Sequence, residues 1–181
     1  QQLFPIHIAA NKADSAKGTP WDAIQANGMI QPTMADMELA LRRADSSGMI
    51  SYSPGSDTFE IVDESKLNPA QINALSSMKE KLAQSGGTGV AELLSRVLFD
   101  ALDHVVVYPV ADETAWKDGE GRILPDAFVV PNGIEAKALA YKVHSDLGDG
   151  FIKAVDGRTR RVVGSEHECG DNDVIKIHAK S

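Results

Sequence analysis

The sequence has a single cysteine, Cys169, among 181 residues, and only 6% of its residues are aromatic. One cysteine cannot form an intrachain disulfide framework, and such sparse use is typical of a reducing compartment. Its apolar runs are far shorter than the roughly 20 residues that a membrane-spanning helix needs. No secretory leader pattern opens the chain either. We therefore expect a cytoplasmic protein without a membrane partner.

Basic residues are also scarce, since 18 Lys and Arg face 26 Asp and Glu, which gives a formal net charge of −8. This balance excludes a chain that is coated with nucleic-acid-binding surface, and no DNA partner is predicted. A local basic cluster nevertheless occurs between residues 153 and 161. The chain begins with Gln1 rather than methionine, so we expect it to be a piece of a longer protein.

Residues 3–10 form an apolar run that is interrupted only by His7 and that ends directly before Asn11-Lys12-Ala13-Asp14. Such a run predicts a strand that begins after Pro5 and is buried on both faces of a parallel sheet. Open α/β sheets place their ligand loops at the carboxyl ends of strands. The NKxD segment therefore occupies the position of a ligand loop.

The residue types of this segment fit guanine. The Asp14 carboxylate can accept two hydrogen bonds at once, which matches the N1–H and N2–H₂ edge of guanine and not adenine. The Lys12 stem can lie along the flat base, and the Asn11 amide can tie the loop to neighbouring backbone. A pattern with three fixed positions also occurs by chance on surface turns, and this alternative stays open.

A second strand is predicted at residues 29–33, followed by Met34-Ala35 and a helix with apolar spacing over residues 37–44. The segment from 36 to 45, DMELALRRAD, resembles the end of the G domain in Obg-related GTPases. In those proteins a Ser-Ala loop contacts the guanine base through its backbone. The resemblance therefore implies base contacts at Met34 and Ala35, where Ala35 matches the motif and Met34 replaces its serine.

The region from 46 to 103 is expected to be an insertion. Residues 46–62 predict a β-hairpin with its turn at Ser53-Pro54-Gly55-Ser56. Asn68-Pro69 predicts a helix start, and Gly86-Gly87 predicts its end. A second amphipathic helix follows from Gly89 to Leu102. We interpret the two helices, joined by SGGTG, as a helical hairpin.

The last third of the chain predicts a small mixed sheet crossed by one helix, the β-grasp pattern. Ala136, Leu139, Ala140, Val143 and Leu147 give that helix one continuous apolar stripe. Trp116, in the polar connection between the first two strands, is expected to cover a core edge. The predicted strands cover residues 105–110, 127–131, 151–155, 161–163 and 174–178.

Two motifs in this last third, A-Y-x-x-H-S-D-L-G at 140–148 and G-D-x-D-V-I-K-I at 170–177, resemble a TGS domain. Together with the NKAD segment, the whole chain resembles the C-terminal half of an archaeal-type Obg/YchF-related GTP-binding protein. The expected fold is mixed α/β and α+β. It combines a remnant of a P-loop GTPase domain (residues 1–45), the insertion (46–103) and the TGS β-grasp domain (104–181).

The resemblance implies a GTP- or GDP-binding protein that acts in translation or at the ribosome, with Mg²⁺ in the intact GTPase. The printed sequence has neither the G-x-x-x-x-G-K-[ST] phosphate loop nor a D-x-x-G segment. Phosphoryl transfer depends on such residues around the γ-phosphate and its metal ion. We therefore predict that this chain alone is inactive and holds no catalytic residue.

The alternative is a stand-alone TGS-type module that binds RNA or protein without a nucleotide. Ordinary solvated salt bridges would explain its basic residues equally well. His167, Cys169 and His178 match no closed zinc-binding spacing, so no metal site is predicted. The residues that could contact RNA are Lys142, His144, Lys153, Arg158, Arg160 and Arg161.

Overall fold

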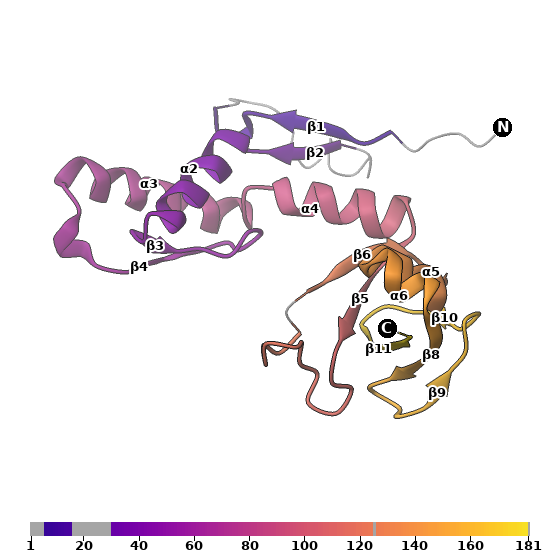
Figure 1. Cartoon of the computed structure of the whole chain (residues 1–181). Helices are drawn as coiled ribbons and strands as arrows, with labels where there is room; N and C mark the ends of the chain where they lie inside the picture. Colours follow the sequence, from indigo (N-terminus) through magenta and orange to yellow (C-terminus); the bar gives the residue numbers. More distant parts are fainter. Residues whose placement is uncertain (1–5, 16–29, 125, 181) are drawn as a thin grey trace. The chain divides into compact units, whose positions relative to one another are not determined.

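The computed structural model of the chain describes residues 6–15, 30–124 and 126–180. The chain divides into two compact units, residues 1–97 and residues 98–181, and each has a hydrophobic core of its own (Figure 1). Met29, which the sequence assigns to the second strand, lies outside the described residues, as do residues 3–5 of the apolar run. No helix formed by the described residues is long and apolar enough to cross a bilayer.

The first unit begins with two parallel strands, β1 (Ile8–Asn11) and β2 (Ile30–Thr33), in which Asn11 is opposite Thr33. Both strands are predicted from the sequence. The expected burial of the first strand on both faces is wrong for its described part, because Ile6 is 71% exposed and Ile8 is 49% exposed. Within the described residues β1 pairs only with β2, so its other edge has no partner strand there.

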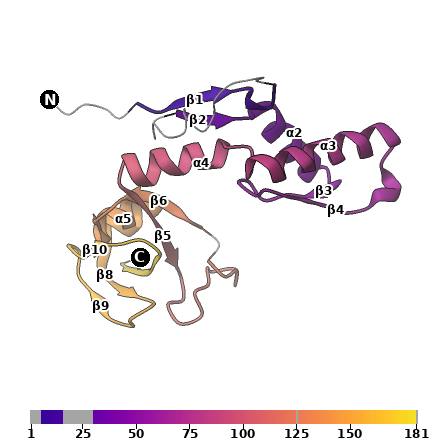
Figure 2. The same cartoon turned by 180° about the vertical axis from the view of Figure 1, so that it is seen from behind.

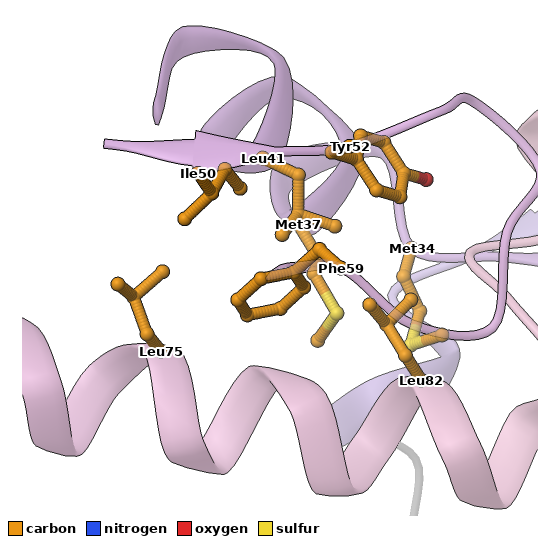
Figure 3. Close-up of a cluster of buried hydrophobic side chains, with 8 residues drawn as sticks. All are labelled: Met34, Met37, Leu41, Ile50, Tyr52, Phe59, Leu75 and Leu82. Carbon is orange, nitrogen blue, oxygen red and sulfur yellow. The ribbon is translucent and has the colours of Figure 1, made fainter. Parts of the chain in front are cut away.

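Helix α2 (Ala35–Ser46) follows β2 and shares one core with the segments after it. These are β3 (Ile50–Ser51), which is antiparallel to β4 (Glu60–Ile61), and helix α3 (Pro69–Ser85). This core spans residues 34–82 and therefore crosses residue 45, the end of the predicted GTPase remnant. Figure 3 shows its buried side chains, which are Met34, Met37, Leu41, Ile50, Tyr52, Phe59, Leu75 and Leu82.

Helix α3 begins and ends where its sequence predicts. The Asn68 side chain accepts a hydrogen bond from the Gln71 N–H, and the Gln71 side chain accepts one from the Asn68 N–H, each at 2.9 Å. Such a reciprocal cap satisfies two backbone donors that the first helical turn would otherwise leave unpaired. At the other end Gly86 has a φ of 72°, the left-handed conformation that closes many helices.

The second predicted helix is present as α4 (Val90–Ser95), continued by a wider helical turn at Arg96–Ala101. Its packing differs from the predicted helical hairpin. Helix α4 packs against β2, and both views draw it beside the β1–β2 pair rather than alongside α3 (Figures 1 and 2). Residues 86–89, Gly-Gly-Thr-Gly, therefore connect the end of α3 to the surface of β2.

The second unit is a five-stranded mixed sheet in the order β6-β5-β11-β8-β9, with helix α5 packed on it. The central strand β11 is parallel to β5 and antiparallel to β8. One helix across such a sheet is the predicted β-grasp arrangement. The strands are β5 (His104–Val110), β6 (Phe128–Pro131), β8 (Phe151–Asp156), β9 (Val162–Val163) and β11 (Asp173–Ala179), with a separate pair of β7 (Ile134–Glu135) and β10 (Glu168–Cys169).

The single helix predicted in this unit is in fact two, α5 (Ala136–Val143) and α6 (Ser145–Asp149). Between them His144 has an extended backbone, with a φ of −163°, and its Nδ1 accepts a hydrogen bond from the Asp146 N–H at 3.2 Å. A side chain that caps a new helix start favours a break at that residue. The apolar periodicity continues across this break and therefore does not reveal it.

The polar connection between β5 and β6 is fastened to the sheet by Trp116. Its indole Nε1 donates to the Gly157 carbonyl at 3.3 Å, and the Arg158 guanidinium lies 5.3 Å from the centre of its ring. An ion pair of 2.9 Å between Lys176 and Glu113 holds the same segment. Trp116 thus lies against the turn between β8 and β9, and its predicted place over a core edge stays a prediction.

Candidate functional site

The carboxyl ends of β1 and β2 meet at Asn11. Its side-chain Oδ1 accepts a hydrogen bond from the Ala35 N–H at 3.1 Å and lies 3.5 Å from the Thr33 hydroxyl. The carboxyl ends of parallel strands lie at the same edge of a sheet. This is why Thr33 and Ala35, which are 22 and 24 residues from Asn11 in the sequence, both reach its side-chain amide. Asn11 therefore ties the NKxD loop to the start of α2, the role that its amide was predicted to have.

The rest of the NKxD loop is a tight turn. Lys12 has a left-handed backbone with a φ of 62°, and the Ser15 N–H donates to its carbonyl at 3.0 Å. Left-handed backbone outside glycine is uncommon and marks a turn that its surroundings hold in place. Asp14 follows in a 3₁₀ turn (Ala13–Ser15), and the Ser15 hydroxyl donates to its Oδ2 at 3.3 Å.

Met34 has its side chain buried in the core (Figure 3). Its N–H donates to the Thr88 carbonyl at 2.8 Å, which fastens the 86–89 loop beside β2. A serine side chain at this position would leave apolar volume unfilled. The replacement that the sequence shows at residue 34 therefore has a packing reason.

A cavity of about 430 Å³ opens beside Asp14. This volume falls within the range of small-molecule sites, roughly 300–1,000 Å³. A second cavity of about 340 Å³ shares Asp14 and Lys81 with the first and also reaches Asp36. The first cavity is lined by Ala13, Asp14, Gln31, Pro32, Met34, Lys81, Gln84, Ser85, Gly86, Gly87, Thr88, Gly89 and Glu92.

Lys81 was not predicted as a site residue from the sequence. It is far from Asp14 along the chain, but the fold brings its ammonium close to the Asp14 carboxylate. Its Nζ is 3.9 Å from Asp14 Oδ2, and the two side chains are 44% and 29% exposed. No local pattern in α3 marks this lysine. The 86–89 loop was likewise predicted only as a connection between helices.

The buried carboxylate of Glu38 is bonded to Thr88, one of the residues that line the first cavity. Glu38 is 4% exposed, and its oxygens accept hydrogen bonds from the Tyr52 hydroxyl at 2.8 Å, the Thr88 hydroxyl at 2.6 Å and Arg42 Nε at 2.6 Å. Burial alone would raise the pKa of Glu38, but these hydrogen bonds outweigh it and hold the pKa below its ordinary value of 4.5. Glu38 thus links α2 to the loop that lines the cavity.

We expect the exchange Glu38→Gln to destabilise the first unit by about 2 kcal/mol at pH 7, because it leaves buried donors imperfectly paired. A lowered folded-state pKa stabilises the protein above the unfolded value of 4.5, and this contribution is lost as pH falls through the folded pKa. The difference between variant and wild type should therefore shrink below pH 4.5 in urea unfolding experiments. Exposed Glu60→Gln serves as the control, and a pH-independent difference would contradict this role.

The structure brings only some of the predicted RNA-contacting residues together. Arg158, Arg160 and Arg161 lie in or directly after the turn between β8 and β9. Lys153 is next to Ala154 in β8, and Ala154 is fully buried in the core that α5 covers. Because neighbouring side chains of a strand point to opposite faces, Lys153 points away from that core. Lys142 is an exposed residue of α5 itself. The predicted set is therefore spread over two sides of the sheet.

Several of these side chains already have partners. Arg158 Nε donates to the Asn172 carbonyl at 2.6 Å, Arg160 donates to the Thr114 hydroxyl at 2.9 Å, and His144 caps α6. Over residues 6–15, 30–124 and 126–180, no hydrogen bond or ion pair involves the side chains of Lys142, Lys153 or Arg161. These three cations are the ones that remain available to a ligand.

Cys169 is 1% exposed, and burial raises the pKa of its thiol to about 12. A thiol in that state is a poor nucleophile and a poor metal ligand at neutral pH. In the described part of the chain no three His, Cys, Asp or Glu side chains are grouped as a metal site would require.

Comparison with known proteins agrees with this arrangement. Residues 9–112 match the model of the G4 motif-containing domain of YGR210-like Obg-like GTPases. The chain is also 44% identical over 177 residues to the uncharacterized GTP-binding protein MJ1332 of Methanocaldococcus jannaschii. The chain belongs to the Obg-like GTPase family. Residues 121–179 of this Obg-like chain match the TGS domain, so both resemblances drawn from the sequence are confirmed.

A solved structure gives the same result for the fold. The Obg-like chain aligns with the crystal structure of a GTP-binding protein from Pyrococcus horikoshii, with 37% identity and a TM-score of 0.66. The alignments cover 96% and 97% of the chain but only 44% of the Methanocaldococcus protein and 46% of the Pyrococcus one. The chain thus spans less than half the length of either relative.

Proposed function

We propose that this chain is the guanine-reading part of a longer GTP-binding protein. The hydrogen bond from Ala35 to Asn11 carries the proposal, because it joins the NKxD turn to the start of α2 and leaves Asp14 beside the cavity. The Asp14 carboxylate would accept from N1–H and N2–H₂ of guanine, and the Lys12 stem would lie along the ring. Both named relatives are GTP-binding proteins, which supports the same assignment.

The exposure of β1 supports the longer protein. A parallel strand pair normally has both faces covered, whereas Ile6 and Ile8 are largely exposed. Further strands and helices of a complete G domain would bury them. In this proposal the phosphate loop and the ligands of Mg²⁺ lie outside the printed residues, so this chain alone would not hydrolyse GTP.

Nucleotide competition tests the proposal. With a fluorescent GDP bound to the full-length protein, we expect GDP to compete at least about 100-fold better than ADP, because adenine lacks both donors that Asp14 would pair. Equal competition by GDP and ADP would remove the guanine assignment.

The TGS domain offers a second function, binding of structured RNA, and with it a cytoplasmic role at the ribosome or elsewhere in translation. The free cations Lys153 and Arg161 favour it, since phosphate contacts need side chains without internal partners. A stand-alone module that docks RNA or protein without a nucleotide is the alternative to the GTP-binding proposal. It would show RNA or protein binding but no guanine preference.

We expect the exchange of both Lys153 and Arg161 for Ala to weaken binding of the chain to structured RNA and to reduce the salt dependence of binding. Each phosphate contact contributes about 0.7–0.9 to the slope of log K against log salt, so the slope should fall by about 1.5. Gel-shift titrations at several salt concentrations measure it. The pair Lys66→Ala and Lys79→Ala removes equal charge from the first unit as a control, and an equal effect there would contradict a TGS contact.

A further inference from the structure

The backbone between β2 and α2 is held from two sides. The Ala35 N–H donates to Asn11 Oδ1 at 3.1 Å. The Met34 N–H donates to the Thr88 carbonyl at 2.8 Å. Residues 34 and 35 are the pair that the resemblance to Obg-related GTPases places against the base. The loop that follows α3, which belongs to neither guanine motif, therefore helps to fix their backbone.

Thr88 holds the start of α2 at two points. Its carbonyl accepts from the Met34 N–H, and its hydroxyl donates to Glu38 Oε2 at 2.6 Å. These two partners lie on either side of Ala35 in the sequence. Thr88 is only 1% exposed, so both bonds are shielded from water and are stronger than the same bonds would be at the surface.

Thr88 is itself fixed by its surroundings. Its acceptor Glu38 is 4% exposed, and the same carboxylate oxygen accepts from the Tyr52 hydroxyl at 2.8 Å. A buried polar network whose members are paired favours one geometry. The next residue, Gly89, approaches the Pro32 carbonyl so closely that a Cβ would overlap it, which keeps the loop seated on β2. The Thr88 carbonyl therefore has a fixed position before any nucleotide binds.

We propose that Thr88 is a positioning residue that holds the backbone of Met34 and Ala35 in the orientation that contacts the O6 edge of guanine. This inference rests on the proposed guanine site and adds the loop after α3 to it. A binding segment that is ordered before its ligand arrives loses less conformational freedom on binding, which raises the affinity. Removal of the Thr88 hydroxyl would loosen this backbone and weaken the contact to O6. The Asp14 carboxylate would still accept from N1–H and N2–H₂.

Base analogues separate the two contacts in the full-length protein. The analogue 6-thio-GDP keeps N1–H and N2–H₂ but replaces O6 with sulfur, a weaker acceptor, whereas IDP keeps O6 and lacks the N2 amine that Asp14 would read. We expect the wild type to prefer GDP to 6-thio-GDP by about 5–10-fold, the effect of one hydrogen bond. Thr88→Val, which keeps the shape of the side chain without its hydroxyl, should reduce this preference to about twofold or less. The ratio of GDP affinity to IDP affinity should stay unchanged.

Two further variants are controls. Thr88→Ser keeps the hydroxyl, and Thr58→Val makes the same exchange at an exposed position of the first unit, so both should retain the two affinity ratios of the wild type. A ratio of affinities does not depend on the folded fraction, so a loss of stability alone cannot produce the expected change. If the valine variant does not fold, Thr88→Ala should show the same loss of preference.

A Thr88→Val protein that binds all three nucleotides equally weakly, or as well as the wild type does, would overturn the role of Thr88 while the guanine site stands. A wild type that binds 6-thio-GDP as well as GDP would overturn it too. A wild type that does not prefer GDP to ADP would instead overturn the proposed function itself.

Discussion

Replacing Gly89 by alanine should destabilise the first unit by about 4 kcal/mol, the largest effect on stability that we expect from a single methyl group. Gly89 has a φ of 75°, which costs a non-glycine residue about 1–3 kcal/mol. A Cβ at this position would also overlap the Pro32 carbonyl oxygen, a backbone atom of β2 that cannot move aside. Overpacking of that kind adds about 1–3 kcal/mol.

Gly48→Ala is a matched control for this experiment. Gly48 has nearly the same backbone, with a φ of 73°, but no atom lies within 4 Å of its added Cβ. It should therefore lose only about 1–2 kcal/mol, the cost of the left-handed backbone. Urea unfolding followed by far-ultraviolet circular dichroism measures both variants. Equal losses would show that Gly89 does not approach β2 as closely as the structure has it.

The position of Gly89 also explains why the 86–89 loop lines the candidate site. Its close approach to Pro32 seats the loop on β2, where Thr88 bonds both the Met34 N–H and Glu38. A substitution that lifts the loop should therefore open the wall of the cavity beside Asp14. Loss of nucleotide affinity in Gly89→Ala would accompany the loss of stability.

Features that depend on neighbouring residues were predictable from the sequence. Asn68-Pro69 marks the start of α3 because the cap and the helix are local, and the alternation and turn residues of the last third predict its β-grasp sheet. The break at His144 was missed since a capping histidine leaves the apolar period intact. Local signals thus give the elements and their order.

Features that depend on distant residues were not predictable. Asp14 and Lys81 are separated by most of the first unit, and no single-sequence pattern reports their ion pair. The shared core that joins residues 34–41 to residues 50–82 also crosses residue 45, where the resemblance to a G domain placed a boundary. The packing of α4 on β2 depends on the missing side chain of Gly89, which the sequence marks only as the start of a helix.

The exchange Asp14→Asn should weaken GDP binding by about 100-fold, the largest functional effect that we expect. It replaces one carboxylate oxygen by an NH₂ group, so a donor would face a donor of guanine and a charge-assisted hydrogen bond would be lost. Xanthine carries a carbonyl oxygen in place of the N2 amine and can accept from that new NH₂ group. XDP should therefore bind the variant better than it binds the wild type.

Equilibrium competition of GDP and XDP against a fluorescent nucleotide, in the full-length protein with and without Asp14→Asn, tests the guanine-reading role most directly. Asp57→Asn removes the same charge from an exposed position of the same unit and should change neither affinity. We expect the Asp14→Asn protein to lose affinity for GDP and to gain affinity for XDP. An Asp14→Asn protein that binds GDP as the wild type does would contradict it.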